Sequence, residues 1–342
     1  MPEGQGGVKP PLFQDIIFPM STLSISLPAE QNIGKMRPLN IMRDLPKVAD
    51  LVELCFHKNM DREGQRYVQQ MRDASLNKRY LNWASTSLPL MGYVWEDQKE
   101  IIGNISVIPF RKGNFLLANI AVHPAHRRKG IARYLTQKGM AYVRQRGAKS
   151  IWLHVEEDNH GAIKLYENLG FEIKTHRTTW SVPKNIDKEL KKSNQPVVIR
   201  PSRFWQQQMQ WLTQNYPAEI SWYRMPDFQI FSPSIKYWLY RIFVENDIRQ
   251  WSIQKDGELQ AVLSWMQTRT RRSPIWLATT PQADAASLAA LLLHARLHLA
   301  PQQVELYLDY PASQNVAAFE MAGLIPLRTL AWMHLDGNKT AT

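Results

Sequence analysis

A short basic turn between an apolar segment and an amphipathic helix carries the strongest chemical signal in this chain. The turn runs from Arg127 to Ala132 and follows Pro124, which ends the apolar run at Ile120–Val122. Backbone N–H groups at a helix N-terminus lack intrahelical partners, and the helix dipole adds about half a positive charge there. Gly130 carries no Cβ that would keep an anion from the backbone. The turn therefore predicts a binding site for a polyphosphorylated ligand.

The spacing of this turn differs from two familiar phosphate loops. It contains neither the Gly-x-x-x-x-Gly-Lys-Ser/Thr of a P-loop nor the Gly-x-Gly-x-x-Gly of a dinucleotide fold. The surrounding residues 123–155 hold eight Lys and Arg and no Asp or Glu. A solvated basic helix and a nucleic-acid-binding surface are the alternative interpretations of that charge.

A second motif lies one helix further along the chain. Residues 151–171 read as a strand, then a helix, then a glycine stop. Its six informative positions are Asn159, Ala162, Leu165, Tyr166, Gly170 and Phe171.

Together, in this order, the two motifs resemble the acyl-CoA site of the GNAT (GCN5-related N-acetyltransferase) superfamily. The family signature Arg/Gln-x-x-Gly-x-Gly/Ala reads here as Arg127-Arg128-Lys129-Gly130-Ile131-Ala132. The second motif resembles the family's Asn-x-x-Ala-x-x-Leu-Tyr-x-x-x-Gly-Phe. The resemblance implies an α/β fold with a mixed, largely antiparallel sheet flanked by helices, and acetyl-CoA as cosubstrate without a metal.

The resemblance also implies a role for each matching position. The backbone of Ile120, Ala121 and Val122 would hydrogen-bond the pantetheine arm. Tyr166 would protonate the leaving thiolate, since a phenol with a pKa near 10 is close to a thiol near 8.5. The diphosphate would sit on the turn, and two later residues would lie beside the pantetheine; these positions are Arg127, Arg128, Lys129, Gly130, Ile131, Ala132, Asn159 and Ala162. Asn159 is also a good helix N-cap.

The general base is the position where the chain departs from the family pattern. Many members place a carboxylate on the strand before the turn, where this chain has Asn119, which cannot take a proton. We take Glu156 as the catalytic base, because it follows Trp152 and His154 on one strand face. Glu157, His123 and a water relay are the alternatives.

Composition limits the class of protein. The 342 residues carry a formal net charge of +12, which suits an acidic ligand, and 44% are hydrophobic, which argues against disorder. One cysteine, Cys55, excludes an intrachain disulfide, and no His-Glu-x-x-His or similar metal spacing occurs. No stretch resembles a membrane span or a secretory leader. We therefore expect a cytoplasmic protein without a metal.

Chain organisation indicates two related domains. We expect an irregular lead-in over 1–37, with one extended piece at 21–27, a catalytic GNAT domain over 38–182, a charged linker over 183–196 and a degenerate GNAT-like copy over 197–336. Val198–Pro201 repeats the pattern of Ile41–Asp44, and Ala317–Leu324 repeats Lys164–Phe171 at a similar separation. Helices are expected over 44–56, 61–76, 132–146 and 161–169, and strands over 40–43, 91–95, 101–109, 115–122, 150–155 and 171–182.

The second copy lacks the chemistry of the first. Its counterpart of the basic turn is Asp284–Ala289, with no cation and no glycine, and Phe319 replaces Tyr166. Residues 204–240 are unusually aromatic, which indicates either core packing or an aromatic wall for an acceptor between the domains.

These observations predict an acetyl-CoA-dependent N-acetyltransferase that acts on a primary amine by direct attack on the thioester. The acceptor would be a small molecule or a protein amine, and the protein a monomer or homodimer. A non-catalytic acyl-CoA-binding sensor or interaction module is the alternative. A nucleic-acid-binding protein is a third, disfavoured because no known nucleic-acid motif is present.

Overall fold

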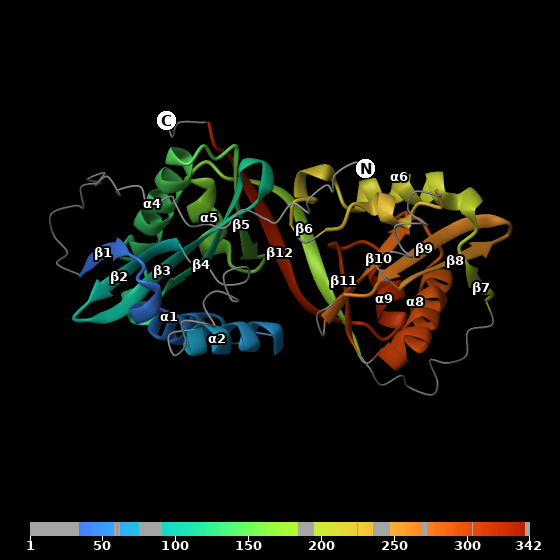
Figure 1. Ribbon diagram of the computed structural model, residues 1–342, viewed down its shortest axis with the longest axis horizontal. Coiled ribbons are helices and arrows are strands. Elements are labelled where there is room, and N and C mark those ends of the chain that lie inside the picture. Colours follow the sequence, from blue (N-terminus) through green and yellow to red (C-terminus); the bar gives the residue numbers. More distant parts are fainter. Residues whose placement is uncertain are drawn as a thin grey trace, which may run out of the picture. The chain divides into compact units, whose positions relative to one another are not determined.

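The protein, seen in a computed structural model, forms one mixed β-sheet with helices against both faces. Residues 34–57, 60, 62–74, 91–183, 195–223, 225–234, 247–268, 272–302 and 304–338 are described. The twelve strands run in the order β1-β2-β3-β4-β5-β12-β6-β11-β10-β9-β8-β7 (Figure 1). Only the β4–β5 and β10–β11 pairs are parallel. The expected α/β class, with a largely antiparallel sheet, is confirmed.

The elements fall into an N-terminal half, residues 34–182, and a C-terminal half, residues 195–338. The strands of the first half are β1 Lys35–Pro38, β2 Met91–Asp97, β3 Glu100–Pro109, β4 Asn114–Val122, β5 Ser150–Glu156 and β6 Glu172–Val182, and its helices are α1 Ile41–Phe56, α2 Arg62–Ala74, α4 Ile131–Gln145 and α5 His160–Glu167. The strands of the second half are β7 Val197–Ile199, β8 Ile248–Lys255, β9 Glu258–Met266, β10 Arg272–Thr279, β11 Glu305–Pro311 and β12 Ile325–Asp336, and its helices are α6 Trp205–Asn215, α8 Ala285–Leu299 and α9 Val316–Met321.

The two halves exchange their last strands. β12, from the C-terminal half, lies between β5 and β6, and β6 lies between β12 and β11. If β1–β6 and β7–β12 trade places, the strand order of the sheet reads the same from its other end. This symmetry is what a tandem repeat of one fold produces, and the exchange makes each half complete only in the presence of the other.

The two halves also share the way in which the helix of the second motif ends. α5 and α9 each end before a glycine with positive φ, Gly170 at +90° and Gly323 at +68°. In both, the next residue donates its N–H back to the aromatic residue of the helix: Phe171 to Tyr166 at 3.0 Å and Leu324 to Phe319 at 2.9 Å. A left-handed glycine closes a helix at low cost because it has no Cβ.

The helices of the N-terminal half cover opposite faces of the sheet. A Cβ at Gly139 in α4 would lie 2.7 Å from Ile105 Cδ1, so α4 packs closely on that face. Val48 and Leu45 of α1 pack with Val94 of β2 on the other face. β3 is rich in apolar residues and is buried over most of its length, because helices cover it on both sides.

One sequence-based element was wrong. Residues 40–43 were expected to form a strand, but Asn40 is the N-cap of α1, and its side chain accepts a hydrogen bond from the Arg43 N–H at 3.2 Å. The strand lies earlier, as β1, paired with β2. The apolar residues Ile41 and Met42 suggested a strand, whereas the capping asparagine and the amphipathic stretch after it favour a helix start.

The remaining expected helices and strands of the first half occur within a few residues of their predicted ends. The extended piece at 21–27 and most of the lead-in and linker lie outside the described residues. None of the described helices is long and apolar enough to cross a membrane.

The strand exchange predicts that the N-terminal half cannot fold alone as a monomer. Residues 1–194, expressed without the rest of the chain, would leave β5 and β6 without the β12 that pairs with both. We expect aggregation or a strand-swapped dimer, measured by size-exclusion chromatography with circular-dichroism melting. Co-expression with residues 195–342 is the control and should restore a cooperative transition. A stable folded monomer of 1–194 would contradict the prediction.

A buried carboxylate fixes the start of α1 against β1. Asp44 accepts hydrogen bonds from Arg37 Nη2 at 3.0 Å, from the Asn40 N–H at 2.7 Å and from Arg43 Nε at 2.9 Å. Burial opposes ionisation of Asp44, but the hydrogen bonds from Arg37, Asn40 and Arg43 outweigh it and lower its pKa. The ionised form is therefore the stabilising one.

We expect Asp44→Asn to lower the free energy of unfolding by about 3 kcal/mol at pH 7, because it leaves a guanidinium without its buried partner. The folded-state pKa is depressed, so this contribution is present above the unfolded pKa of about 3.9 and is lost as the pH falls through the folded-state pKa. Urea unfolding at several pH values measures it. Asp97→Asn, on β2, should change stability by less than about 0.5 kcal/mol. An equal difference between wild type and Asp44→Asn at all pH values would contradict the assignment.

Candidate acyl-CoA site

The site begins where two parallel strands separate. β4 pairs with β5 only from Asn114 to Leu117, opposite Ser150 to Leu153. Beyond these positions β4 continues against β3, and β5 continues against β12. A gap between two sheet strands leaves backbone N–H and C=O groups that need partners. In the N-terminal half, β4 lines this gap with Ile120–Val122, the segment whose backbone is expected to hydrogen-bond the pantetheine arm.

A β-bulge bends β4 at the gap. The register against β3 shifts between the pairs Asn104↔Ala121 and Ser106↔Ala118. Asn119, within the bulge, has a positive φ of +49°, which asparagine tolerates better than most residues. Its carbonyl accepts a hydrogen bond from the fully buried Asn104 side chain at 2.9 Å. Asn104 thus supports the bend that separates β4 from β5.

The position that often carries the family's carboxylate belongs to an uncharged network. Asn119 Nδ2 donates to the Tyr67 hydroxyl of α2 at 2.9 Å and lies 3.3 Å from Ser106 Oγ. These groups are polar and neutral, so they can hold and orient a bound group without supplying negative charge. Asn119 therefore acts structurally in the bulge, and any base must come from elsewhere.

The basic turn has the backbone of an anion site. Arg128 and Gly130 both have left-handed φ angles, +63° and +81°. The first intrahelical bond of α4 runs from the Tyr134 N–H to Gly130 O at 3.1 Å, so the N–H groups of Ile131, Ala132 and Arg133 precede it. A Cβ on Gly130 would approach the Tyr134 ring to 3.3 Å, on an exposed backbone. The turn can present free N–H groups to phosphate oxygens.

Cations surround this turn at the surface. Arg127, Arg128 and Lys129 are exposed, and Arg127 Nε donates to the Val122 carbonyl at 3.2 Å. The same carbonyl receives the Cys55 thiol at 3.4 Å. The turn and the end of β4 are therefore joined into one region, with Val122 at the junction.

The second motif flanks the gap on β5 and α5. Asn159 is the N-cap of α5 and accepts the Ala162 N–H at 3.2 Å, so its structural role is present whether or not it contacts a cofactor. Tyr166 is buried against Phe171, with ring centroids 6.2 Å apart. Burial raises the pKa of Tyr166 above its usual value of 10. Its phenol is thus protonated throughout the neutral pH range, as a general acid must be.

The candidate bases lie at the end of β5 and beyond β4. Glu156 is partly exposed and continues the strand face of His154, while Glu157 is exposed beside His176, with 3.9 Å between Oε1 and Nε2. His123 accepts the Ala125 N–H at 3.3 Å through Nδ1 and so caps the turn after Pro124. This leaves Glu156 as the carboxylate nearest in sequence to the gap on β5.

The equivalent gap in the C-terminal half is filled by the chain itself. β10 and β11 pair only from Arg272 to Pro274 before they separate. Beyond that point Asn215 Nδ2 donates to Leu277 O at 3.3 Å and to Thr279 O at 3.0 Å, and the Tyr216 hydroxyl accepts the Leu277 N–H at 3.3 Å. These are the backbone groups of β10 that a pantetheine arm would otherwise meet.

A buried ion pair holds this plug in place. Arg177 of β6 donates to the Asn215 carbonyl at 2.9 Å and is paired with Asp309 of β11. Tyr216 packs against Trp276 and is fully buried, which raises the pKa of its phenol. At the start of α8, Asp284 caps the helix by accepting the Ser287 N–H at 2.8 Å, so a carboxylate occupies the place of the basic turn. In the C-terminal half the backbone of β10 is hydrogen-bonded by Asn215 and Tyr216, and the turn before α8 carries a carboxylate.

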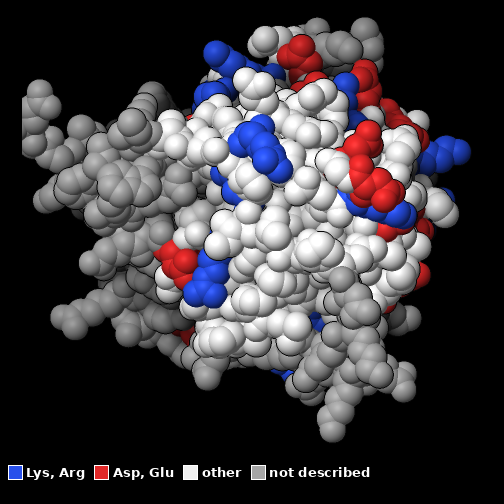
Figure 2. All heavy atoms as spheres, turned by 90° about the vertical axis from the view of Figure 1, so that its right-hand side faces the viewer, with Lys and Arg blue, Asp and Glu red and all other residues white. Residues whose placement is uncertain are grey.

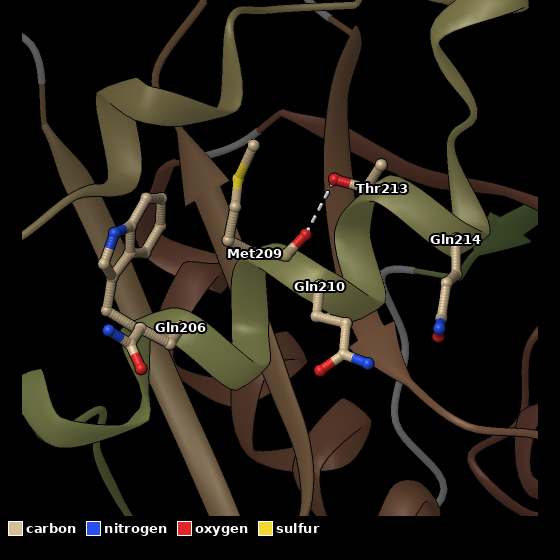
Figure 3. Close-up of a pocket in the computed structure, with 6 residues that line it drawn as sticks. Gln206, Met209, Gln210, Thr213 and Gln214 are labelled. Carbon is tan, nitrogen blue, oxygen red and sulfur yellow. Dashed lines mark hydrogen bonds between the residues drawn. The ribbon is translucent and has the colours of Figure 1, made fainter.

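A surface hollow in the C-terminal half is unrelated to the gap. It runs along α6 and is lined by one helix face that carries no titratable side chain (Figure 3). Thr213 Oγ1 is directed back to the Met209 carbonyl at 2.9 Å, as the close-up shows. Nothing in this lining can transfer a proton or bind a phosphate strongly. The lining residues are Trp205, Gln206, Met209, Gln210, Thr213 and Gln214.

Among the described residues, positive charge is not concentrated at the end of the sheet where β7 and β8 lie. Figure 2 shows that end, where uncharged atoms predominate and the blue and red groups are scattered in small, often adjacent sets. A nucleic-acid surface would need a continuous basic stripe. The face in this view has none among its described atoms.

Comparison with known proteins finds a family match within the N-terminal half. Residues 50–171 match the Acetyltransferase (GNAT) family. This match begins within α1 and includes β4, the basic turn and the second motif. Residues 50–171, within the N-terminal half, are thus similar to the GNAT acetyltransferases.

Two characterised relatives resemble this chain over short stretches. The chain is 41% identical over 63 residues to mycothiol acetyltransferase of Thermobispora bispora, which is 18% of this chain and 19% of that protein. It is 41% identical over 64 residues to the [ribosomal protein bS18]-alanine N-acetyltransferase of Escherichia coli, or 19% of this chain and 43% of that protein. The chain thus spans less than half the length of these relatives.

A solved structure extends the likeness to nearly the whole chain. A GCN5-related N-acetyltransferase from Sphaerobacter thermophilus superimposes with a TM-score of 0.56, over 89% of this chain and 96% of that one, at 13% identity. Sequence identity this low shows a shared fold and nothing finer. The GNAT fold expected from the two motifs is therefore confirmed.

Four residues at the gap escaped the sequence analysis as site candidates. Tyr67, Asn104, Cys55 and His154 lie on four different elements and match no motif position. Asn104 was the most accessible to prediction, because an asparagine inside an apolar strand requires a buried hydrogen-bond partner. The other three reach the gap only through tertiary packing.

Proposed function

We propose that the protein is an acetyl-CoA-dependent N-acetyltransferase whose chemistry takes place in residues 38–182, with residues 197–336 as a supporting, cofactor-free copy. One contrast carries the proposal. The gap of the N-terminal half leads to a turn with free N–H groups and exposed cations, whereas the gap of the C-terminal half is plugged and lies beside a carboxylate. The match of residues 50–171 to the GNAT family and the acetyltransferase names of the relatives support it.

Each segment of the proposed site would bind a different part of acetyl-CoA. The turn from Arg127 to Ala132 would bind the diphosphate through backbone N–H groups and cations. The backbone of Ile120, Ala121 and Val122 would align the pantetheine, with Asn159 and Ala162 alongside. Acetyl-CoA supplies the thioester that a neutral amine attacks.

Proton movement then requires one acid and one base. Glu156 would take the proton of the acceptor ammonium, and Tyr166 would give its proton to the departing sulfur. The amide N–H of Val122 would polarise the thioester carbonyl. Holding both partners in the gap supplies much of the rate through orientation alone.

One observation favours a second candidate, a non-catalytic acyl-CoA sensor. The family's common carboxylate position holds Asn119, tied into a neutral network with Tyr67. A sensor would bind acetyl-CoA with the same turn and release no CoA in the presence of any amine. Turnover separates the two functions, since binding alone is common to both.

Gly130→Asp should weaken acetyl-CoA binding by about 100-fold, because it adds a negative charge and a Cβ at the phosphate turn. Isothermal titration calorimetry measures the effect, and the wild type should bind one acetyl-CoA per chain. Gly147→Asp is the matched control, since Gly147 is also left-handed, at +72°, but ends α4 and has open space around it. No binding by the folded wild type would overturn the proposal.

Tyr166→Phe should lower kcat by about 100-fold or more while leaving the Kd for acetyl-CoA unchanged, because it removes only the donated proton. CoA release with a panel of amines measures turnover. Tyr142→Phe is the control, as it removes another buried phenol, on α4, whose hydroxyl lies 3.2 Å from Met91 Sδ. Equal activity of wild type and Tyr166→Phe would remove Tyr166 from the mechanism.

A further inference from the structure

Five aromatic side chains form a continuous wall beside the gap. Two come from β5, one from β12 and two from the segment after α6 in the C-terminal half. Neighbouring ring centroids lie 4.0 to 6.5 Å apart. The members of this aromatic wall are Trp152, His154, Trp222, Tyr223 and Trp332.

The wall lies on the face of the sheet opposite α4. Leu117 meets α4, since a Cβ on Gly139 would lie 3.4 Å from Leu117 Cδ2. Its neighbour Leu116 packs with Trp152 and Trp332 instead, because successive strand residues point to opposite faces. The turn that would hold the diphosphate belongs to α4. An acceptor can therefore reach the gap from the wall side without crossing the phosphate site.

The wall also reaches the start of the gap. His154 is the first residue of β5 beyond its last pair with β4, and Ala118 is the first of β4. Ala118 and Tyr223 both pack against the Leu116 cluster. Glu156, the proposed base, follows His154 on the same strand face. The aromatic wall, the gap and the Glu156 carboxylate thus follow one another along the same face of the sheet.

Two features distinguish the wall from ordinary core packing. The indole N–H groups of Trp152, Trp222 and Trp332 are buried with no hydrogen-bond acceptor among the described residues, although buried indoles usually have one. Trp152 and Trp332 are buried, whereas His154, Trp222 and Tyr223 are partly exposed and form the accessible part of the wall. Stable cores avoid unpaired donors, whereas binding surfaces retain aromatic area for a ligand.

We propose that the acceptor is a primary amine attached to a flat, aromatic body, which packs on this wall, and that Tyr223 of the C-terminal half is a specificity-determining residue for it. The inference rests on the proposed acetyltransferase function. The amine would enter from the wall side and lie between the gap and Glu156. The C-terminal half, with its own gap closed, then contributes substrate recognition in place of chemistry.

The test compares three amines with acetyl-CoA: 2-phenylethylamine, putrescine and a peptide with a free N-terminal alanine. We expect kcat/KM for 2-phenylethylamine to exceed that for the other two by at least about tenfold, as one aromatic contact contributes roughly this factor. Tyr223→Ala should raise its KM about tenfold with an unchanged Kd for acetyl-CoA, and Tyr223→Phe should retain wild-type KM.

Trp205→Ala, in the α6 hollow, is the matched control for loss of a partly exposed aromatic residue and should leave KM unchanged. A melting temperature for each variant detects any loss of folding. Preference for putrescine or the peptide, or an unchanged KM in Tyr223→Ala, would overturn this inference and leave the proposed function intact. Acetyl-CoA binding without turnover of any of the three amines would also overturn it. Absence of acetyl-CoA binding would overturn both.

Discussion

The exchange of β6 and β12 is the constraint on which the rest of the structure depends. β6 pairs on both edges with strands of the C-terminal half, β12 and β11, and β12 pairs on both edges with strands of the N-terminal half, β5 and β6. The halves therefore cannot separate without exposing several strand edges, and unpaired edges are costly in water and prone to aggregate. Because β12 pairs along β5, the exchange also fixes the far side of the gap between β4 and β5.

Within this framework, the gap between the two parallel strands differs between the two halves. In the N-terminal half the bulge at Asn119 bends β4 away from β5, and the turn after β4 presents free N–H groups. In the C-terminal half Asn215 and Tyr216 satisfy the equivalent backbone groups of β10. Since a buried backbone polar group without a partner costs about as much as a lost hydrogen bond, a half that binds no cofactor must fill its gap.

The C-terminal half, whose own gap is closed, reaches the open gap of the N-terminal half. The segment after α6 brings Trp222 and Tyr223 against β5 and β12. The C-terminal half thus places side chains beside the gap of the N-terminal half, because the two halves share one sheet.

The sequence by itself determined the elements whose causes are local. The basic turn with Gly130, the capped helix before Gly170 and the apolar run of β3 each follow from a few neighbouring residues, and the family could be inferred from them. The strand at 40–43 failed because two local signals, apolar residues and a capping asparagine, compete there. Tertiary structure alone decided the strand exchange, the plug at Tyr216 and the partners of Asn119, because each joins residues far apart in the chain. Periodicity specifies which face of a strand is buried, and it contains no information on which distant strand or side chain lies against it.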